Sequence, residues 1–205
     1  MRQADHAVSG VDASAQVVGE ADWTAHWQQG KRFAYVLATE GTERVNPGFA
    51  AQYADSFDVG LIRGAYHFAL PDRSSGAEQA EFFVDQGGVW RADGMTLPGA
   101  LNLEFNPYGK ADYGLSRAAL AEWVLDFGDT YKEWTGRYPV VYTSAVWWSQ
   151  CAGADFGTPN PLRVDRFSAA PGALPRPWGV YPLWDRPSPP AERDPQDRLL
   201  ALVAD

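Results

Sequence analysis

The chain has 205 residues, and its 26 Asp and Glu outnumber its 17 Lys and Arg, which gives a formal net charge of −9. An acidic chain is a poor candidate for binding nucleic acid or an anionic membrane surface through long-range charge. Hydrophobic residues make up 45% of the sequence, which excludes disorder over most of the chain. We expect a single domain over residues 1–205, with a disordered stretch at residues 1–6.

The sequence offers little metal, redox or cofactor chemistry. Cys151 is the single cysteine, so no intrachain disulfide can form, and with only 3 His no zinc site is expected. Glycine-rich nucleotide and phosphate motifs are absent, so we expect no metal and no cofactor. The N-terminal residues contain no apolar signal segment, which predicts a cytoplasmic protein, or a secreted one if a leader has been removed.

Short apolar runs alternate along the chain with amphipathic segments. The runs expected to form strands are residues 7–12, 33–38, 61–68, 100–105, 138–142, 162–164 and 181–184. The segments expected to form helices are residues 22–29, 47–59, 75–89, 116–136, 145–150 and 195–203. The helix at 116–136 is the clearest, because Ser116 can cap its start, Gly136 can end it, and its apolar residues fall at helical spacing.

Repeated alternation of strand and helix predicts an α/β fold with a parallel sheet. Seven or eight strands favour a barrel over an open sheet. A full eightfold barrel typically takes about 250 residues, so some helices must be short or missing. We therefore expect a single-domain, distorted (β/α) TIM-type barrel with a reduced number of helices.

Active sites of parallel barrels lie at the carboxyl ends of the strands. Asn102 and Glu104 are two residues apart, so they share one face of their strand, and Leu101 and Leu103 take the other. A carboxylate on the inner face is costly to bury unless it is paired or used, and it can serve as a general acid. The other polar residues at predicted strand ends are Asp12, Glu40, Tyr66, His67, Tyr142 and Thr143.

His67, Trp147 and Trp148 are expected to have structural roles rather than roles in the site. Tyr66 and His67 are adjacent and point to opposite faces, so at most one lies in the pocket, and we expect His67 to be a hydrogen-bonded structural histidine. Trp147 and Trp148 are expected to belong to the core rather than to a sugar-stacking platform.

Several segments, found together in this order, resemble glycoside hydrolase family 25, the muramidases and lysozymes of the actinomycete and fungal type. The matching segments are residues 10–12 (Gly-Val-Asp), 38–42 (Ala-Thr-Glu-Gly-Thr), 63–68 (Arg-Gly-Ala-Tyr-His-Phe), 101–107 (Leu-Asn-Leu-Glu-Phe-Asn-Pro) and 141–143 (Val-Tyr-Thr) with Trp147-Trp148. The resemblance covers residues 8 to about 186. It implies a distorted barrel and cleavage of the β-1,4 bond after N-acetylmuramic acid in peptidoglycan.

The resemblance also implies roles for individual residues. Glu104 takes the position of the general acid, and Asn102 that of the carboxylate thought to steer the substrate's own acetamido group. Asp12, Glu40 and Tyr66 match supporting polar residues of the pocket. Asp12 joins Glu104 and Asn102 as our third catalytic candidate. The substrate-binding candidates are Glu40, Tyr66, Tyr142, Trp184, Asp185 and Arg186.

The chain departs from the family pattern at several pocket positions. Asn102 stands where the family has Asp, as a natural or an engineered replacement, and Leu37 stands where a Lys is common. An amide cannot act as a base, but it can hold and polarise an N-acetyl group, as the Asn of family 85 endo-glucosaminidases does beside its Glu. Near the end, the family's Phe-Trp-Gln-Tyr becomes Leu-Trp-Asp-Arg at residues 183–186.

Three functions remain open, and of these we favour the first, with the other two as alternatives. The missing export signal and the altered pocket favour a repurposed intracellular enzyme that uses Glu104 for acid/base chemistry on a small molecule, for example in secondary metabolism. The matching active-site strand favours a muramidase with an Asn-Glu pair. Loss of the Asp at position 102 favours a non-catalytic glycan-binding protein. In each case the expected partner of the monomeric protein is a small molecule or a glycan, with no nucleic acid and no membrane.

Overall fold

The computed structural model describes residues 8–14, 22–152, 158–165, 174–175, 178–179 and 183–184. Within them eight strands form one sheet in the order β1-β2-β4-β5-β6-β7-β8, with β3 paired antiparallel to β2 and every other pair parallel. The strands are β1 (Ser9–Ala13), β2 (Lys31–Glu40), β3 (Arg44–Val45), β4 (Ile62–Phe68), β5 (Ala100–Leu103), β6 (Val140–Ser144), β7 (Leu162–Asp165) and β8 (Leu183–Trp184).

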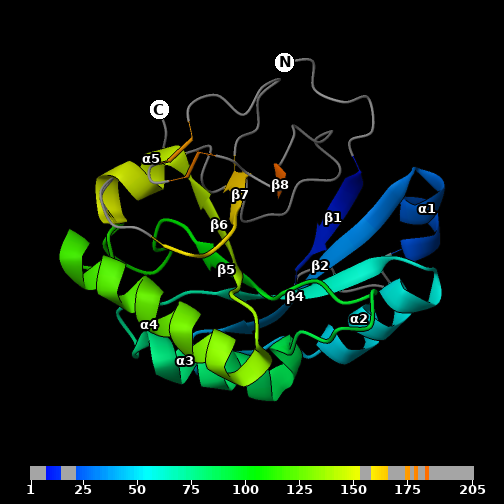
Figure 1. The fold of residues 1–205 in the computed structure, drawn as a ribbon, viewed down its shortest axis with the longest axis horizontal. Helices are drawn as coiled ribbons and strands as arrows, with labels where there is room; N and C mark the ends of the chain where they lie inside the picture. Colours follow the sequence, from blue (N-terminus) through cyan, green and yellow to red (C-terminus); the bar gives the residue numbers. More distant parts are fainter. Residues whose placement is uncertain are drawn as a thin grey trace.

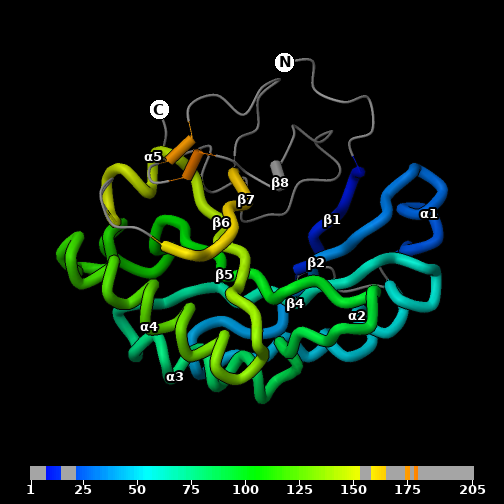
Figure 2. Tube along the Cα trace, viewed as in Figure 1, coloured from blue at the N-terminus to red at the C-terminus, as the bar shows by residue number. Residues whose placement is uncertain are grey.

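The sheet curls, and its outer face is covered by helices (Figures 1 and 2). This curled, mostly parallel sheet with few helices confirms the predicted distorted barrel. The α-helices are α1 (Trp23–Gln28), α2 (Phe49–Asp58), α3 (Gly76–Phe83), α4 (Arg117–Thr135) and α5 (Ala145–Trp147). Single π-type turns extend two of them, η1 (Val84–Gly88) after α3 and η2 (Trp148–Ala152) after α5. The predicted helix at 195–203 and the stretch at 1–6 lie outside the described residues.

Both ends of helix α4 are determined by single residues of the sequence. The side chain of Ser116 accepts a hydrogen bond from the backbone N–H of Ala119, which satisfies a donor that the first turn leaves open. Gly136 ends the helix in the left-handed conformation, with φ of 80°, which glycine adopts without steric cost. Both predicted ends of this helix are therefore confirmed.

The core between the sheet and helices α3 and α4 is largely aromatic. Trp123, Phe127 and Tyr131 follow one another along α4, with neighbouring ring centroids 5.7 and 6.5 Å apart. Phe83 of α3 stacks against the last two of these rings. The hydroxyl of Tyr131 donates to the carbonyl of Gly88 and accepts from the N–H of Gly99, so its polar end is satisfied inside the core.

His67 belongs to this outer layer and not to the interior of the barrel. It is fully buried, its ring stacks on Phe127, and its Nε2 lies 2.9 Å from Gln79 Oε1. Because that oxygen can only accept, Nε2 carries the proton, and Nδ1 accepts from the hydroxyl of Thr39 at 2.8 Å. Burial lowers the pKa of His67 to about 4. The prediction of a hydrogen-bonded structural histidine is confirmed.

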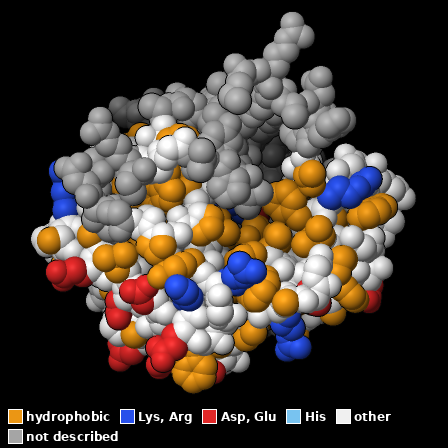
Figure 3. Space-filling view, in the orientation of Figure 1, with side chains coloured by type: hydrophobic (Ala, Val, Ile, Leu, Met, Phe, Trp, Pro, Cys, Tyr) orange, Lys and Arg blue, Asp and Glu red, His pale blue; other side chains and the backbone are white. Residues whose placement is uncertain are grey.

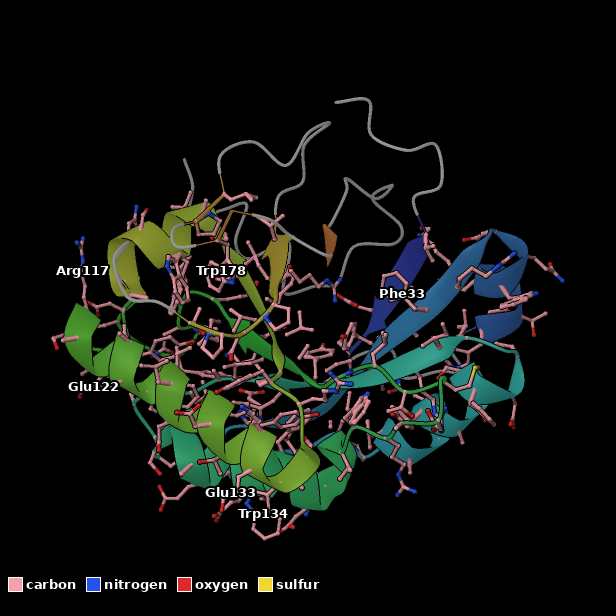
Figure 4. The ribbon with its side chains drawn as sticks, viewed as in Figure 1. Phe33, Arg117, Glu122, Glu133, Trp134 and Trp178 are labelled. Carbon is pink, nitrogen blue, oxygen red and sulfur yellow. The ribbon has the colours of Figure 1, made fainter. Side chains whose placement is uncertain are left out.

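Trp147 and Trp148 are both fully buried, as predicted for core residues. The ring of Trp148 contacts that of Trp178 at 4.5 Å, and the indole N–H of Trp178 donates to the carbonyl of Asn160. Figure 4 shows Trp178 beside the short helix α5. These contacts fix residues that follow β6 and β7 against the sheet, so neither Trp147 nor Trp148 is available as a sugar platform.

Candidate active site

Strand β5 carries the two polar residues at the centre of the candidate site. Leu101 and Leu103 are fully buried on the helix-covered face, so Asn102, and Glu104 directly after the strand, lie on the inner face. In the ladder Asn102 is flanked by Phe68 of β4 and Tyr142 of β6. Glu104 is 9% exposed. The structure therefore brings Asn102 and Glu104 to one edge of the sheet, as the spacing predicted.

Tyr113 anchors the backbone at this point. Its hydroxyl lies 3.0 Å from the carbonyl oxygen of Glu104 and 3.2 Å from that of Ala69, which ties the end of β5 to the end of β4. Burial raises the pKa of Tyr113 far above its usual range, and the negative charges of Glu104, Asp72 and Glu40 add to the rise. Glu104 and Glu40 are thus both close enough to one tyrosine to act on it electrostatically.

A β-bulge in β2 directs Glu40 towards the interior. Leu37 pairs with Tyr66, but the next paired residue is Thr39, which lies opposite His67, so the register shifts around Ala38. Because of this extra residue, Thr39 faces the helices with His67 and Glu40 follows on the inner face beside Phe68. Glu40 is 8% exposed, and its Oε2 lies 3.6 Å from a guanidinium nitrogen of Arg44.

Tyr66 on β4 and Tyr142 on β6 lie on the inner face of the sheet, on either side of β5. Both are buried, Tyr66 next to Ala100 of β5 and Tyr142 next to Asn102. Tyr66 is in the opposite orientation to His67, as predicted from their adjacency. Aromatic rings therefore flank β5 on the side where its polar residues lie, an arrangement suited to a sugar ring with apolar faces and polar edges.

Asp12 is held by a partner that the sequence interpretation did not include. Its two carboxylate oxygens accept hydrogen bonds from both terminal nitrogens of Arg163, at 2.9 and 2.6 Å. The guanidinium of Arg163 also lies over the rings of Tyr35 and Tyr142, 5.5 and 5.1 Å from their centroids. Asp12 is on β1 and Arg163 on β7, so this pair connects strands that lie far apart in the order of the sheet.

The remaining candidates lie at or beyond the edge of the described structure. The backbone of Trp184 is part of β8, beside Val164, while its side chain, Asp185 and Arg186 lie outside what is described. The sequence interpretation also did not include Tyr108 and Tyr113, which come from the loop after β5. Within the described ranges, no three His, Cys, Asp or Glu residues lie close enough to hold a metal ion. No helix of these ranges is long and apolar enough to cross a membrane.

Charge is unevenly distributed over the surface. Figure 3 shows acidic side chains gathered at the lower left of one face, where α3 and α4 lie, and hydrophobic side chains nearer the sheet. The helix layer therefore carries much of the negative charge visible on this face.

The comparisons with known proteins agree on one family. The model of glycosyl hydrolases family 25 matches residues 11–184. An N,O-diacetylmuramidase from Chalaropsis sp is 40% identical over 183 residues, which are 86% of this chain and 86% of that protein. Lysozyme M1 of Streptomyces globisporus is 40% identical over 179 residues, 86% of this chain and 60% of its own length.

Solved structures give the same result. The muramidase from Acremonium alcalophilum superposes with a TM-score of 0.86 and 41% identity, over 97% of this chain and 100% of that one. The bacterial lysozyme from Streptomyces coelicolor superposes with a TM-score of 0.84 and 39% identity, over 89% and 85% of the two chains. The chain described here belongs to family 25 of the glycosyl hydrolases.

Proposed function

We propose that this protein is a muramidase, which hydrolyses the β-1,4 bond after N-acetylmuramic acid in peptidoglycan. One observation carries the proposal: Asn102 and Glu104 lie on the inner face of a curled parallel sheet, at the carboxyl end of β5. The relatives support this function better than an intracellular enzyme acting on a small molecule, since those with 40% identity are named N,O-diacetylmuramidase and lysozyme. No comparison supports the small-molecule interpretation.

Glu104 is the proposed general acid. Its protonated carboxyl gives its proton to the glycosidic oxygen as the bond between that oxygen and C1 of the muramic acid breaks. The carboxylate then takes a proton from the water that attacks C1, which returns Glu104 to its starting state. A largely buried carboxyl is suited to this role because little competing water surrounds it.

Asn102 is the proposed orienting residue. In a substrate-assisted reaction the carbonyl oxygen of the substrate's own acetamido group attacks C1 while the glycosidic bond breaks, and water later opens the resulting ring. The amide of Asn102 can hydrogen-bond that acetamido group and hold it beneath C1. It cannot remove a proton, so all proton transfer in this scheme passes through Glu104.

The other inner-face residues shape the pocket in this proposal. Tyr66 and Tyr142 flank β5 and contact the sugar rings, and Glu40 binds substrate beside them. Asp12 acts through Arg163, whose position it holds. Contacts from Trp184, Asp185 and Arg186 remain predictions.

Release of soluble muropeptides from purified peptidoglycan, measured by mass spectrometry, tests the function. We expect disaccharide-peptides from the parent protein and a loss of at least about a hundredfold in rate for Glu104→Gln. Glu122→Gln makes the same chemical change on the exposed face of α4 and should leave the rate unchanged (Figure 4).

Two other outcomes would contradict this proposal. No release by folded parent protein, beside a working lysozyme, would overturn hydrolysis, and retained binding to the glycan would then support the non-catalytic alternative. Equal rates for the parent and Glu104→Gln would remove Glu104 from the mechanism.

A further inference from the structure

Tyr113, in the loop between β5 and α4, has a backbone conformation that a bulky side chain does not favour. Its φ is 59°, and within the described ranges it is the one residue other than glycine with a positive φ. A left-handed backbone brings Cβ close to the following carbonyl oxygen, so such a residue adopts it only where its surroundings hold it there. The conformation of Tyr113 is therefore maintained by the contacts that its backbone and side chain make.

A tight turn holds Tyr113 in this conformation. The N–H of Tyr113 donates to the carbonyl of Lys110 at 2.8 Å. The N–H of Gly114 donates to Asp112 Oδ1 at 2.9 Å, and the N–H of Leu115 donates to the carbonyl of Asp112 at 3.1 Å. The loop thus reverses before α4 begins, and the side chain of Tyr113, which is buried, reaches back to the end of β5.

The hydroxyl of Tyr113 lies at the point where the ladder between β4 and β5 ends. The last pair of that ladder is Phe68 with Asn102, and the N–H of Ala69 donates to the carbonyl of Asn102 at 3.0 Å. Just beyond it, the hydroxyl lies 3.0 Å from the carbonyl oxygen of Glu104 and 3.2 Å from that of Ala69. Its single proton is shared between the two acceptors. Tyr113 therefore joins the two chains after their ladder has ended.

The same hydroxyl remains a hydrogen-bond donor in neutral and acidic solution. Burial raises the pKa of Tyr113 far above its usual range, and the negative charge of Glu104 adds to the rise. A backbone carbonyl can only accept a hydrogen bond, so a neutral hydroxyl suits both acceptors, whereas a phenolate would suit neither. The connection between the two strand ends therefore persists at every pH at which a carboxyl group such as that of Glu104 acts as an acid.

We propose that Tyr113 is a positioning residue, which fixes the backbone of Glu104 so that the carboxyl group of Glu104 meets the glycosidic oxygen. The inference rests on the proposed muramidase function and adds a buried residue that acts through Glu104. Glu104 follows the last residue of β5, so its backbone needs support beyond the ladder. Misplacement of a catalytic group by about 1 Å can slow a reaction about a hundredfold, so a hydrogen bond that holds this carbonyl in place affects the rate.

Hydrolysis of soluble, uncrosslinked peptidoglycan chains, measured per folded molecule, tests this role. Tyr113→Phe removes the hydroxyl and keeps the ring, so we expect kcat to fall about thirtyfold while KM stays within about twofold. A residue that only stabilised the fold would lower the melting temperature and leave the kcat of folded molecules unchanged.

A second variant acts on the turn and keeps the hydroxyl. Asp112→Ala removes the side chain that accepts from the N–H of Gly114, and should lower kcat about threefold. Asp112 is exposed, so this variant should fold even if Tyr113→Phe does not. In that case a kcat equal to that of the parent would overturn the positioning role.

Tyr131→Phe is the matched control. The hydroxyl of Tyr131 also joins two backbone groups inside the protein, the carbonyl of Gly88 and the N–H of Gly99, both at 2.8 Å. Gly99 precedes β5, so this contact lies at the opposite end of the strand from Glu104. We expect Tyr131→Phe to lose stability, as Tyr113→Phe does, and to keep the kcat of the parent. Equal losses of kcat in the two variants, or no loss in Tyr113→Phe, would overturn the positioning role.

Hydrogen exchange distinguishes failure of this inference from failure of the muramidase function. The amide hydrogen of Ala69 donates to the carbonyl of Asn102 at the end of the ladder, and Tyr113→Phe should speed up its exchange about tenfold. Tyr131→Phe should leave that exchange unchanged. If the parent releases no muropeptides, the muramidase function fails, while faster exchange in Tyr113→Phe would still support fixation of the strand ends by Tyr113. Unchanged exchange in Tyr113→Phe would overturn the positioning role, whatever the rate of hydrolysis.

Discussion

The carboxylate of Asp12 on β1 and the guanidinium of Arg163 on β7 form a bidentate ion pair, at 2.9 and 2.6 Å, across the interior of the curled sheet. These strands are separated by β2, β4, β5 and β6 in the order of the sheet. The pair therefore links the first strand to one of the last without a backbone ladder between them. It also keeps the guanidinium over Tyr35 and Tyr142.

The two halves of this pair should differ in their effect on stability. Arg163 has a side chain only 7% exposed, whereas that of Asp12 is 35% exposed. Asp12→Asn leaves a buried guanidinium without its carboxylate, so we expect a loss of about 3 kcal/mol in the free energy of unfolding. Arg163→Met leaves a carboxylate that water can reach, and should cost only about 1 to 2 kcal/mol. Urea denaturation measures both, and the reverse order would contradict this account.

Stability should fall in mildly acidic solution because of His67. The folded protein holds this side chain neutral with a pKa of about 4, while an unfolded histidine titrates near 6.5. The unfolded chain thus binds the additional proton first, and stability decreases as the pH falls from about 6.5 to about 4. The contribution of His67 to this loss is about 3 kcal/mol.

Denaturation of the parent and of His67→Gln at pH 7 and at pH 4 separates this contribution from that of other groups. His67→Gln should be less stable at pH 7, because it loses the hydrogen bonds to Thr39 and Gln79 in their native geometry. It should lose less stability than the parent on acidification. An equal loss in both proteins would assign the pH dependence to other residues.

Substitution of Asn102 tests the division of roles on β5. Asn102→Ala removes the proposed contact with the acetamido group, and we expect the rate of muropeptide release to fall about a hundredfold while the fold is retained. Asn102→Asp places a second negative charge two residues from Glu104 on the same face, which disfavours ionisation of Glu104. The basic limb of the pH–rate profile should then move to higher pH. An unchanged pH–rate profile would show that the side chain at position 102 does not influence the ionisation of Glu104, and would contradict this account.

Gly76 is required where α3 approaches α4. A Cβ atom at this position would lie 2.3 Å from the carbonyl oxygen of Trp123 and 2.5 Å from the backbone nitrogen of Phe127. Backbone atoms cannot rotate away, so Gly76→Ala should force the helices apart and cost about 3 kcal/mol. Gly94→Ala is the matched control, since nothing lies within 4 Å and only its φ of +72° opposes a side chain, at about 1 kcal/mol. Thermal denaturation that ranks the two equally would contradict a packing role for Gly76.

Much of the fold follows from local signals in the sequence. Ser116 begins α4 and Asp22 begins α1, because their side chains accept a hydrogen bond from a backbone N–H of the first turn. Gly136 ends α4 because glycine adopts the left-handed conformation without steric cost. Asn102 and Glu104 share one face because side chains alternate between the two faces of a strand, and this alternation can be read from the sequence alone. Strand β3, only two residues long, has no such signal and was not predicted.

The parts of the site that the sequence did not predict depend on distant residues. Arg163 stands between Leu162 and Val164 in a buried strand, and a charged residue in that setting is expected to have a partner. That signal was present, but it does not identify a partner 151 positions away. Arg44 and Tyr108, 64 positions apart, likewise meet through a hydrogen bond of 3.1 Å, and no spacing in the sequence brings these two residues together.

The bulge around Ala38 makes one feature of the site depend on the backbone geometry of β2 and not only on the identity of its residues. Tyr35 and Leu37 face inwards, so strict alternation would turn Thr39 into the pocket and Glu40 against His67, and the bulge is what returns Glu40 to the inner face. A chain that lacked Ala38 would alternate without a bulge and would keep Thr39 and Glu40 on the faces that they occupy here. Sequence alignments of this segment must consequently be judged by their gaps as well as by their matching letters.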